Sequence, residues 1–277
     1  MTFLLDSIAN SEITFLVGST KDIFQIIFFL VVGIVTVLSY KQARKTLFTP
    51  IKTEIFKMQV KAFEEILGFF QNRTETDFTT VFDFNHIVYA NSTLMFTEFI
   101  EHFYKGDMKI DDEKVKSLHE SFHGAIVTQT WAEKNFVAPE YFENKTEEKK
   151  EDITNPAIIL EHWKKYEYGP INFSKKYFEE TEKLNLLIAS PLIPVQLKTE
   201  LEKFDNTVKK NLYLVGITLN EIAQELPHRF PTASSLKKFE KSGIWNKYNK
   251  QKKDLEPIAT SILAYIRTYL KIDKLVD

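Results

Sequence analysis

The sequence predicts an all-α protein, in which one transmembrane helix near the amino end is followed by a cytoplasmic bundle of long helices. Three observations lead to this prediction. The 277 residues include only 8 Gly and 9 Pro, too few for a loop-rich β architecture. Residues 23–40 form an unbroken apolar run. Farther along, apolar residues recur at spacings of three and four, which is the period of an amphipathic helix.

The apolar run at residues 23–40 reads IFQIIFFLVVGIVTVLSY, with Gln25 as its only strongly polar side chain. This length just reaches what a helix needs to cross the hydrocarbon core of a bilayer. A helix buried in a protein core keeps one polar face, and this run has none. A cleaved signal peptide begins with basic residues, but residues 1–20 contain no Lys or Arg. We therefore expect a permanent span.

The basic residues around the span predict its orientation. Only Lys21 precedes it, whereas six follow: Lys41, Arg44, Lys45, Lys52, Lys57 and Lys61. Cells keep such residues on the cytoplasmic side. We therefore expect a single-pass protein of the inner (cytoplasmic) membrane, with residues 1–22 outside and the rest of the chain in the cytoplasm.

After the span we expect a juxtamembrane stalk helix at residues 41–71 and an α-helical domain at residues 72–277. The dipeptide Thr49–Pro50 fits the start of the stalk helix, because Ser, Thr and Pro favour helix amino ends. An a/d seam follows, formed by Phe56, Val60, Phe63, Leu67 and Phe70.

The domain divides into further predicted elements. Residues 81–89 have the β propensity of a strand but no clear partner, so helical or irregular structure is favoured there. Residues 139–155 are charged and predict an exposed loop. Helices are expected over residues 94–104, 111–136, 156–168 and 173–189.

The longest regular pattern starts after Pro191 and Pro194 and predicts a helix of roughly 30 residues. Its apolar positions are Leu197, Leu201, Phe204, Val208, Leu212, Val215, Leu219, Ile222 and Leu226. Pro227 and Pro231 indicate its end. A last helical region follows, split near Gly243 or Pro257.

The motif that points most directly to chemistry is His119-Glu120-Ser121-Phe122-His123, an H-E-x-x-H pattern. On a helix, His119 and His123 would lie one turn apart and chelate Zn²⁺, with Glu120 as general base. Over these five residues the chain resembles the helix of zinc-dependent metallopeptidases. The extended form of that motif is absent, because Gln129 stands where a third His would be. Solvated histidines that bind no metal are the favoured interpretation.

The sequence gives little support to other enzyme classes. The chain has no Cys, which excludes disulfides, thiolate metal sites and cysteine nucleophiles. No G-x-x-x-x-G-K-[ST] or G-x-G-x-x-G motif occurs, and no Arg precedes a His at the spacing of the helical HEPN ribonucleases. We therefore expect a protein that is not an enzyme and has no cofactor, with zinc as the alternative.

The run from Lys237 to Lys253 contains seven lysines and one glutamate, interleaved with aromatic residues. A solvated helix face is the simplest interpretation. The functional alternative is contact with an anionic surface, for which lipid is favoured over nucleic acid because the domain is tethered to a membrane. The candidate residues are Lys237, Lys238, Lys241, Trp245, Lys247, Lys250, Lys252 and Lys253.

These observations favour a membrane-anchored helical module that self-associates or binds a cytoplasmic protein partner. Small anchored proteins of this kind often act as effectors or sensors in bacterial stress responses or antiviral defence, and we extend the hypothesis to that role by association. One alternative is a membrane-tethered zinc metallohydrolase that uses His119, Glu120 and His123. Another is an effector that forms a pore by assembling several spans.

Overall fold

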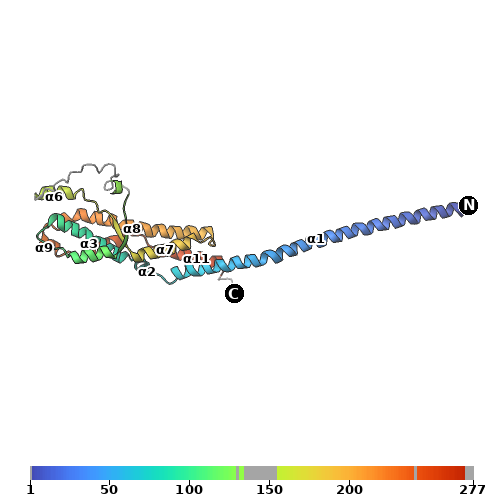
Figure 1. Ribbon diagram of the computed structural model, residues 1–277, viewed down its shortest axis with the longest axis horizontal. Coiled ribbons are helices and arrows are strands. Elements are labelled where there is room, and N and C mark those ends of the chain that lie inside the picture. Colours follow the sequence, from blue (N-terminus) through green and yellow to red (C-terminus); the bar gives the residue numbers. More distant parts are fainter. Residues whose placement is uncertain (1, 129–130, 134–154, 240–241, 272–277) are drawn as a thin grey trace. The chain divides into compact units, whose positions relative to one another are not determined.

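The computed structural model (Figure 1) describes residues 2–128, 131–133, 155–239 and 242–271, with side chains described from Phe24 onward except that of Leu47. Helices make up 77% of the structure and strands very little, so the predicted all-α class is confirmed. The chain divides into two units, Met1–Lys61 and Ala62–Asp277, and each is described by itself.

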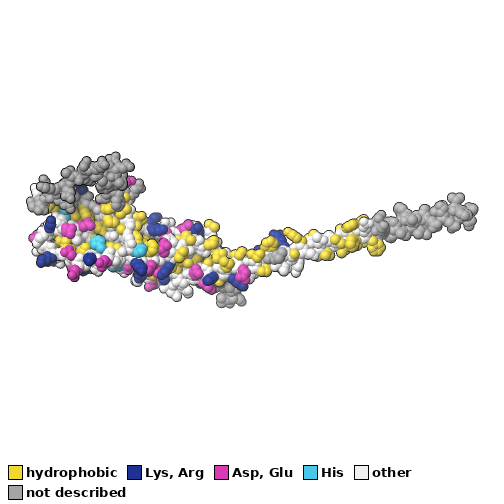
Figure 2. Space-filling model, in the orientation of Figure 1, with side chains coloured by type: hydrophobic (Ala, Val, Ile, Leu, Met, Phe, Trp, Pro, Cys, Tyr) yellow, Lys and Arg dark blue, Asp and Glu magenta, His cyan; other side chains and the backbone are white. Residues whose placement is uncertain are grey.

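The first unit consists of the greater part of one long helix, α1 (Thr2–Phe70). Among the described residues, the part of α1 from Phe24 onward is the one helix long and apolar enough to cross a membrane. No residue of its most apolar 18-residue window is buried. The exposed fractions of its large apolar side chains range from 43% at Val32 to 73% at Phe24. Figure 2 shows these hydrophobic side chains open along the helix.

The helix start predicted at Thr49 and Pro50 is wrong, because α1 runs through both residues without a break. Proline lacks the N–H that would bond to the carbonyl of Thr46, so one bond of the helical ladder is missing there. The turns on either side keep their own hydrogen bonds, and exposure leaves the freed carbonyl open to other donors. The propensity of Pro for helix starts therefore did not decide the local structure.

The second unit is organised around α8 (Val195–Arg229), whose 35 residues confirm the predicted long helix. Its most extensive contacts are with four helices and one strand: α3 (Phe84–Phe103), α7 (Lys175–Ala189), α10 (Ser242–Gln251), α11 (Glu256–Tyr269) and β2 (Ile171–Ser174). All nine apolar positions of the predicted pattern, from Leu197 to Leu226, are buried. This apolar seam, one of two that favoured self-association beside the stalk seam from Phe56 to Phe70, is therefore covered within the chain.

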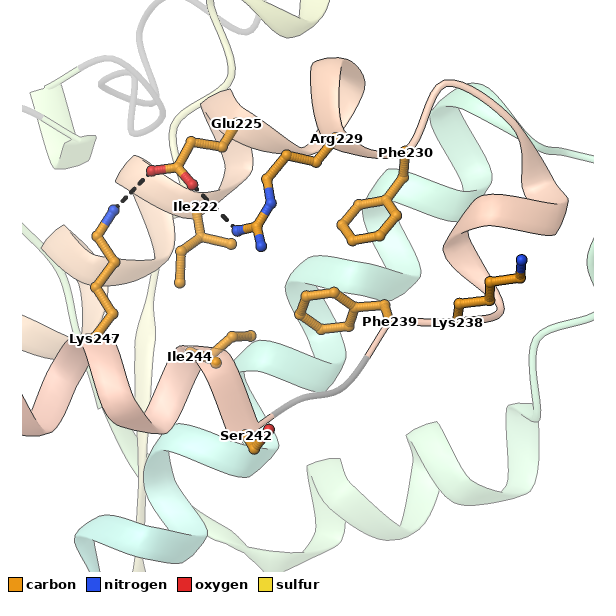
Figure 3. A pocket seen from close by; sticks show the side chains of 10 residues that line it. Ile222, Glu225, Arg229, Phe230, Lys238, Phe239, Ser242, Ile244 and Lys247 are labelled. Carbon is orange, nitrogen blue, oxygen red and sulfur yellow. Dashed lines mark hydrogen bonds and ion pairs between the residues drawn. The ribbon is translucent and has the colours of Figure 1, made fainter.

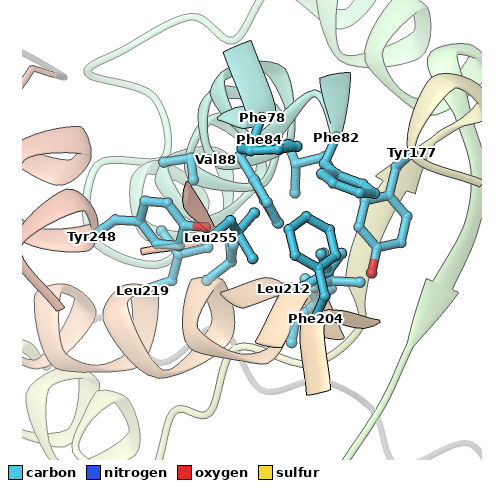
Figure 4. Packing of buried hydrophobic residues seen from close by; sticks show 14 of the residues in the cluster. Phe78, Phe82, Phe84, Val88, Tyr177, Phe204, Leu212, Leu219, Tyr248 and Leu255 are labelled. Atoms are coloured by element: carbon cyan, nitrogen blue, oxygen red, sulfur yellow. The ribbon is translucent and has the colours of Figure 1, made fainter. Parts of the chain in front are cut away.

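Aromatic rings fill the core around Phe204 of α8 (Figure 4). Its ring centroid lies 4.9 Å from that of Phe70, 5.2 Å from Phe78 and 6.1 Å from Phe82. Edge-to-face and tilted ring pairs of this kind add attraction beyond the burial of apolar area. Phe70 is the last residue of α1, so the carboxyl end of the predicted stalk seam packs inside the second unit.

Two helix amino ends cap each other. In α2 (Glu75–Val81) the Glu75 carboxylate accepts hydrogen bonds from the backbone N–H of Leu255 at 2.6 Å and of Glu256 at 3.0 Å. The Glu256 carboxylate at the start of α11 accepts in return from the Glu75 N–H at 2.9 Å. These contacts satisfy N–H groups that have no partner inside their own helices. They fasten α2 to α11 across 180 residues of sequence.

A two-stranded antiparallel sheet replaces part of two predicted helices. The helix expected at 111–136 ends at Ser121, as α4 (Asp112–Ser121), and β1 (Phe122–Ile126) follows it. The helix expected at 173–189 begins two residues later, because Phe173 belongs to β2. At Gly124 an added Cβ would lie 2.8 Å from the Phe173 ring, so any larger residue would require this ring to shift.

The helix predicted at 156–168 is shorter in the structure, as α6 (Pro156–Trp163), and Asn155 caps its amino end. The predicted loop at 139–155 lies outside the described residues except for this cap. The predictions over 81–89 and 94–104 agree with the structure, where α3 covers most of both ranges as helix.

Buried Asn91 of α3 holds the two-stranded sheet in place. Its side-chain amide donates to the carbonyls of Ile87 at 2.7 Å and Asn172 at 2.8 Å. Its oxygen accepts from the Tyr168 hydroxyl and from the Asn172 backbone N–H, both at 2.8 Å. A fully satisfied buried amide fixes the register of the elements that it joins.

Different elements form the two ends of the second unit. Phe63, at its chain start, packs on Tyr269 of α11 at 5.2 Å between ring centroids, and α11 lies along α8. The carboxyl end of α8 lies about 50 Å from its start, at 1.5 Å per residue. There the short helix α9 (Ala233–Leu236) follows, at the far end of the unit in Figure 1.

Candidate functional site

The H-E-x-x-H residues do not share a helix face. His119 and Glu120 lie exposed in the last turn of α4, whereas His123 lies in β1. The His123 ring packs on Phe178 of α7, with 4.3 Å between ring centroids. The helical spacing that would aim both imidazoles at one metal is therefore missing. Among the described residues, no group of three His, Asp or Glu side chains could hold a metal ion. Zinc binding stays a prediction for metal analysis to test.

A second histidine contact was not predicted from the sequence. His86 Nε2 lies 3.3 Å from Ser121 Oγ, although the two residues are far apart in the chain. Ser121 Oγ donates its proton to the carbonyl of Leu118 at 2.7 Å. A catalytic serine would instead direct that proton to the imidazole. The contact therefore fits a role in ending α4 better than a role as nucleophile and base.

In the structure, the residues of the basic run have different surroundings. Lys247 and Lys252 are engaged in ion pairs: Lys247 with Glu221 at 3.0 Å, and Lys252, whose side chain is 4% exposed, with Glu75. Trp245 is partly buried and packs on Tyr248 of the core. Lys241 lies outside the described residues. The remaining lysines, Lys237, Lys238, Lys250 and Lys253, are exposed, and lipid contact stays a prediction for them.

A pocket of about 290 Å³ opens at the far end of the second unit, between the carboxyl end of α8, the residues that follow α9, and α10 (Figure 3). Two of the predicted lysines line it, together with an arginine, one carboxylate and apolar side chains. The lining residues are Ile222, Glu225, Arg229, Phe230, Lys238, Phe239, Ser242, Gly243, Ile244 and Lys247. The rings of Phe230 and Phe239 meet edge to face with centroids 5.2 Å apart.

The charges in this pocket are partly paired. Glu225 accepts from Lys247 at 2.9 Å and from Arg229 at 3.4 Å. Partial burial lowers the pKa of Lys247, but hydrogen bonds with Glu225 and Glu221 outweigh this effect and raise it above its ordinary value. Hydrogen bonds from Lys247 and Gln251 lower the pKa of Glu221. Both shifts favour the charged forms of Lys247 and Glu221.

The lining as a whole carries three cations and one carboxylate beside two aromatic rings. This combination suits a ligand group that bears a carboxylate or phosphate and has an apolar part to lie against the rings. Among the described lining residues, no nucleophile is held by a base.

No protein-family model, curated protein or solved structure matches this chain. The function must therefore be argued from the geometry of the chain itself.

Sequence reasoning missed part of this pocket. Lys238 and Lys247 were among the predicted residues, but Glu225, Arg229 and Phe230 were not. The available signal was the pair His228 and Arg229 directly after the long apolar pattern, because basic residues favour helix carboxyl ends. That signal marks the end of α8 and does not show which charges face the same cavity.

Proposed function

We propose that the chain is a membrane-anchored binding module, held in the cytoplasmic membrane by the apolar part of α1, with its helical bundle in the cytoplasm. The observation that carries this proposal is the exposure of the apolar side chains from Phe24 to Tyr40. Water makes such exposure unfavourable, at about 25 cal/mol for each Å² of apolar surface, whereas lipid removes the penalty. The absence of a polar face means that lipid must cover all sides.

The orientation rests on charge. Six basic residues follow the apolar part and one precedes it. The positive-inside rule then places the amino end outside the cell and the second unit in the cytoplasm.

The proposed work of the cytoplasmic unit is to bind a protein partner or a second copy through the pocket at its far end. That pocket lies at the opposite end of the second unit from Phe63 and Tyr269. An acidic side chain with an apolar neighbour would meet Arg229 and Lys238 beside Phe230. A role as effector or sensor in bacterial stress or antiviral defence extends this proposal by association.

The anchor is tested by fractionation of the full-length chain. After cell lysis and ultracentrifugation we expect it in the membrane pellet, and we expect it to stay there after extraction with alkaline carbonate. Release into the supernatant would overturn the proposal. The chain contains no Cys, so single cysteines at Ser11 and Ser234 can report orientation. A membrane-impermeant maleimide applied to intact cells should label the first and spare the second.

The binding role is tested by the mass of the complex extracted from native membranes in mild detergent. We expect a mass above that of one chain, which falls when Arg229 and Lys238 are both changed to Gln. The matched control changes Lys176 and Lys210, exposed lysines of α7 and α8, to Gln. A monomer in the wild type, or equal loss in the control, would contradict the proposed use of the pocket.

A further inference from the structure

Residues 41–61, which continue α1 beyond its most apolar part, combine strong positive charge with exposed apolar side chains. Six residues of this segment are basic: Lys41, Arg44, Lys45, Lys52, Lys57 and Lys61. Glu54 is the only acidic residue, so six positive charges against one negative charge leave a net charge of +5. Glu54 and Lys57 form an ion pair at 2.8 Å, with both side chains 66% exposed. Such an open pair contributes little to stability.

The apolar side chains of this segment are large and open. Phe48, Ile51, Ile55, Phe56 and Met58 are between 47% and 55% exposed. Ile51, Ile55 and Met58 follow each other at spacings of four and three, so they share one face of the helix. No described residue of the first unit covers that face. Phe56 lies outside this face, about 100° around the helix from Ile55. A helix that combines an apolar stripe with basic residues on its other sides is the type that lies in a membrane interface.

The helix is weakened in the middle of this segment. Pro50 leaves the carbonyl of Thr46 without its usual helical partner. Three threonine hydroxyls donate to carbonyls one turn earlier: Thr46 to Gln42 at 2.9 Å, Thr49 to Lys45 at 2.5 Å and Thr53 to Thr49 at 2.9 Å. Proline and such threonine contacts are both common causes of helix bending. The residues after Pro50 can therefore change direction at low cost.

We propose that residues 51–61 form an amphipathic helix that lies on an anionic phospholipid surface, with Ile51, Ile55 and Met58 inserted between the headgroups. This inference rests on the proposed membrane anchor, because the anchor keeps the segment beside the bilayer. A second copy is the competing occupant of the apolar face. It would bring a net charge of +5 against another +5, and repulsion opposes that pairing, whereas anionic lipid complements the charge.

The test uses the full-length chain with one cysteine, at Ile55→Cys, carrying a polarity-sensitive fluorophore. The protein is reconstituted into vesicles of phosphatidylcholine, with or without roughly one third phosphatidylserine. We expect a blue-shifted emission that is much larger with phosphatidylserine and weakens as salt rises, because salt screens the charges. The control is Thr53→Cys, which lies on the opposite side of the helix and should stay in a polar environment.

Charge variants then measure the electrostatic contribution to membrane binding by residues 51–61. Lys52, Lys57 and Lys61 are changed together to Gln, and the ratio of inserted to free helix is read from the emission. We expect about a fivefold loss for each lysine, or about a hundredfold in all. The matched control changes Lys176, Lys198 and Lys210 of the second unit to Gln and should leave the ratio unaltered.

Each outcome has a separate meaning. A chain that fails to stay with the vesicles under carbonate overturns the proposed anchor. A chain that stays with them but shows no shift at position 55, or the same shift without phosphatidylserine, overturns only the interfacial helix. A shift that depends on protein density, accompanied by energy transfer between labelled copies, would assign the apolar face to a second chain and also overturn it.

Discussion

The two long helical stretches of this protein, the apolar part of α1 and the whole of α8, contain similar apolar residues in opposite surroundings. Ile34 of α1 is 59% exposed, whereas Leu201 and Phe204 of α8 have no exposed surface. In α8 the apolar residues occupy one face, and polar residues such as Lys210 and Glu221 occupy the other. Between Phe24 and Tyr40 of α1 no such polar face exists.

This comparison shows that the distribution of apolar residues around a helix, more than their number, indicates what covers them. A one-sided stripe is satisfied by neighbouring helices of the same chain, and in α8 it is. An all-round apolar surface needs a surrounding apolar solvent. Substitutions in each helix test this difference.

The largest effect is expected from charges placed in α1. Ile27 and Ile34 changed together to Arg should move the chain from the membrane pellet to the soluble or degraded fraction, because each Arg opposes insertion by about 3 kcal/mol. The matched control changes Ile158 and Ile217, which are 44% and 54% exposed in the second unit, to Arg. An equal loss from the membrane pellet in both double variants would contradict the proposed difference between the two helices.

Truncation of a core side chain in α8 should have the second largest effect. Phe204→Ala removes a ring that touches three other phenylalanines, so the free energy of unfolding should fall by about 3–5 kcal/mol. Denaturant titration of the detergent-solubilised chain, followed by Trp fluorescence, measures the loss. Phe178→Ala, at a ring that is 38% exposed, should cost much less. Membrane partition should not change in either variant.

Removal of the polar contact between α3 and the two-stranded sheet should have a smaller effect. Asn91→Ala leaves the Tyr168 hydroxyl and the backbone of Asn172 without partners, at a cost of about 2–3 kcal/mol. The same titration applies, with exposed Asn85→Ala as the control. An unchanged midpoint would mean that water or another group replaces the amide.

The smallest effect concerns Glu98, which accepts a hydrogen bond from Tyr166 at 2.6 Å. Burial raises the pKa of Glu98, the Tyr166 bond opposes the shift, and Glu101 adds to it. A carboxyl group with a raised pKa favours folding when protonated, so its contribution is complete below its ordinary pKa and is lost as pH rises through the raised value. Glu98→Gln should therefore stabilise the chain slightly near pH 7, by well below 1 kcal/mol because water still reaches part of the side chain, and leave it unaltered near pH 4.

Thermal unfolding in detergent at the two pH values measures this difference, and Glu64→Gln, at an exposed position of α1, is the control. Stabilisation of equal size at both pH values would show that the charge of Glu98 is not the cause.

Sequence patterns predicted the long helices better than the junctions between them. The period from Leu197 to Leu226 gave α8 correctly, because one face repeats over many turns. The prediction over 111–136 was wrong past Ser121, since β1 depends on pairing with β2 about fifty residues later. The basic run was treated as one surface, yet Lys252 is buried against Glu75, a residue 177 positions away.

The all-α class, the apolar segment without a polar face, and the one-sided pattern of α8 could all be predicted from the order of the residues. These properties are local, because each depends on the order of residues within a few helical turns. The tertiary structure decided which lysines are paired and which are open, where Glu225, Arg229 and Phe230 share a pocket, and that the stripe of α8 is covered within one chain. Those properties depend on contacts between residues distant in sequence, and no periodicity along the chain specifies them.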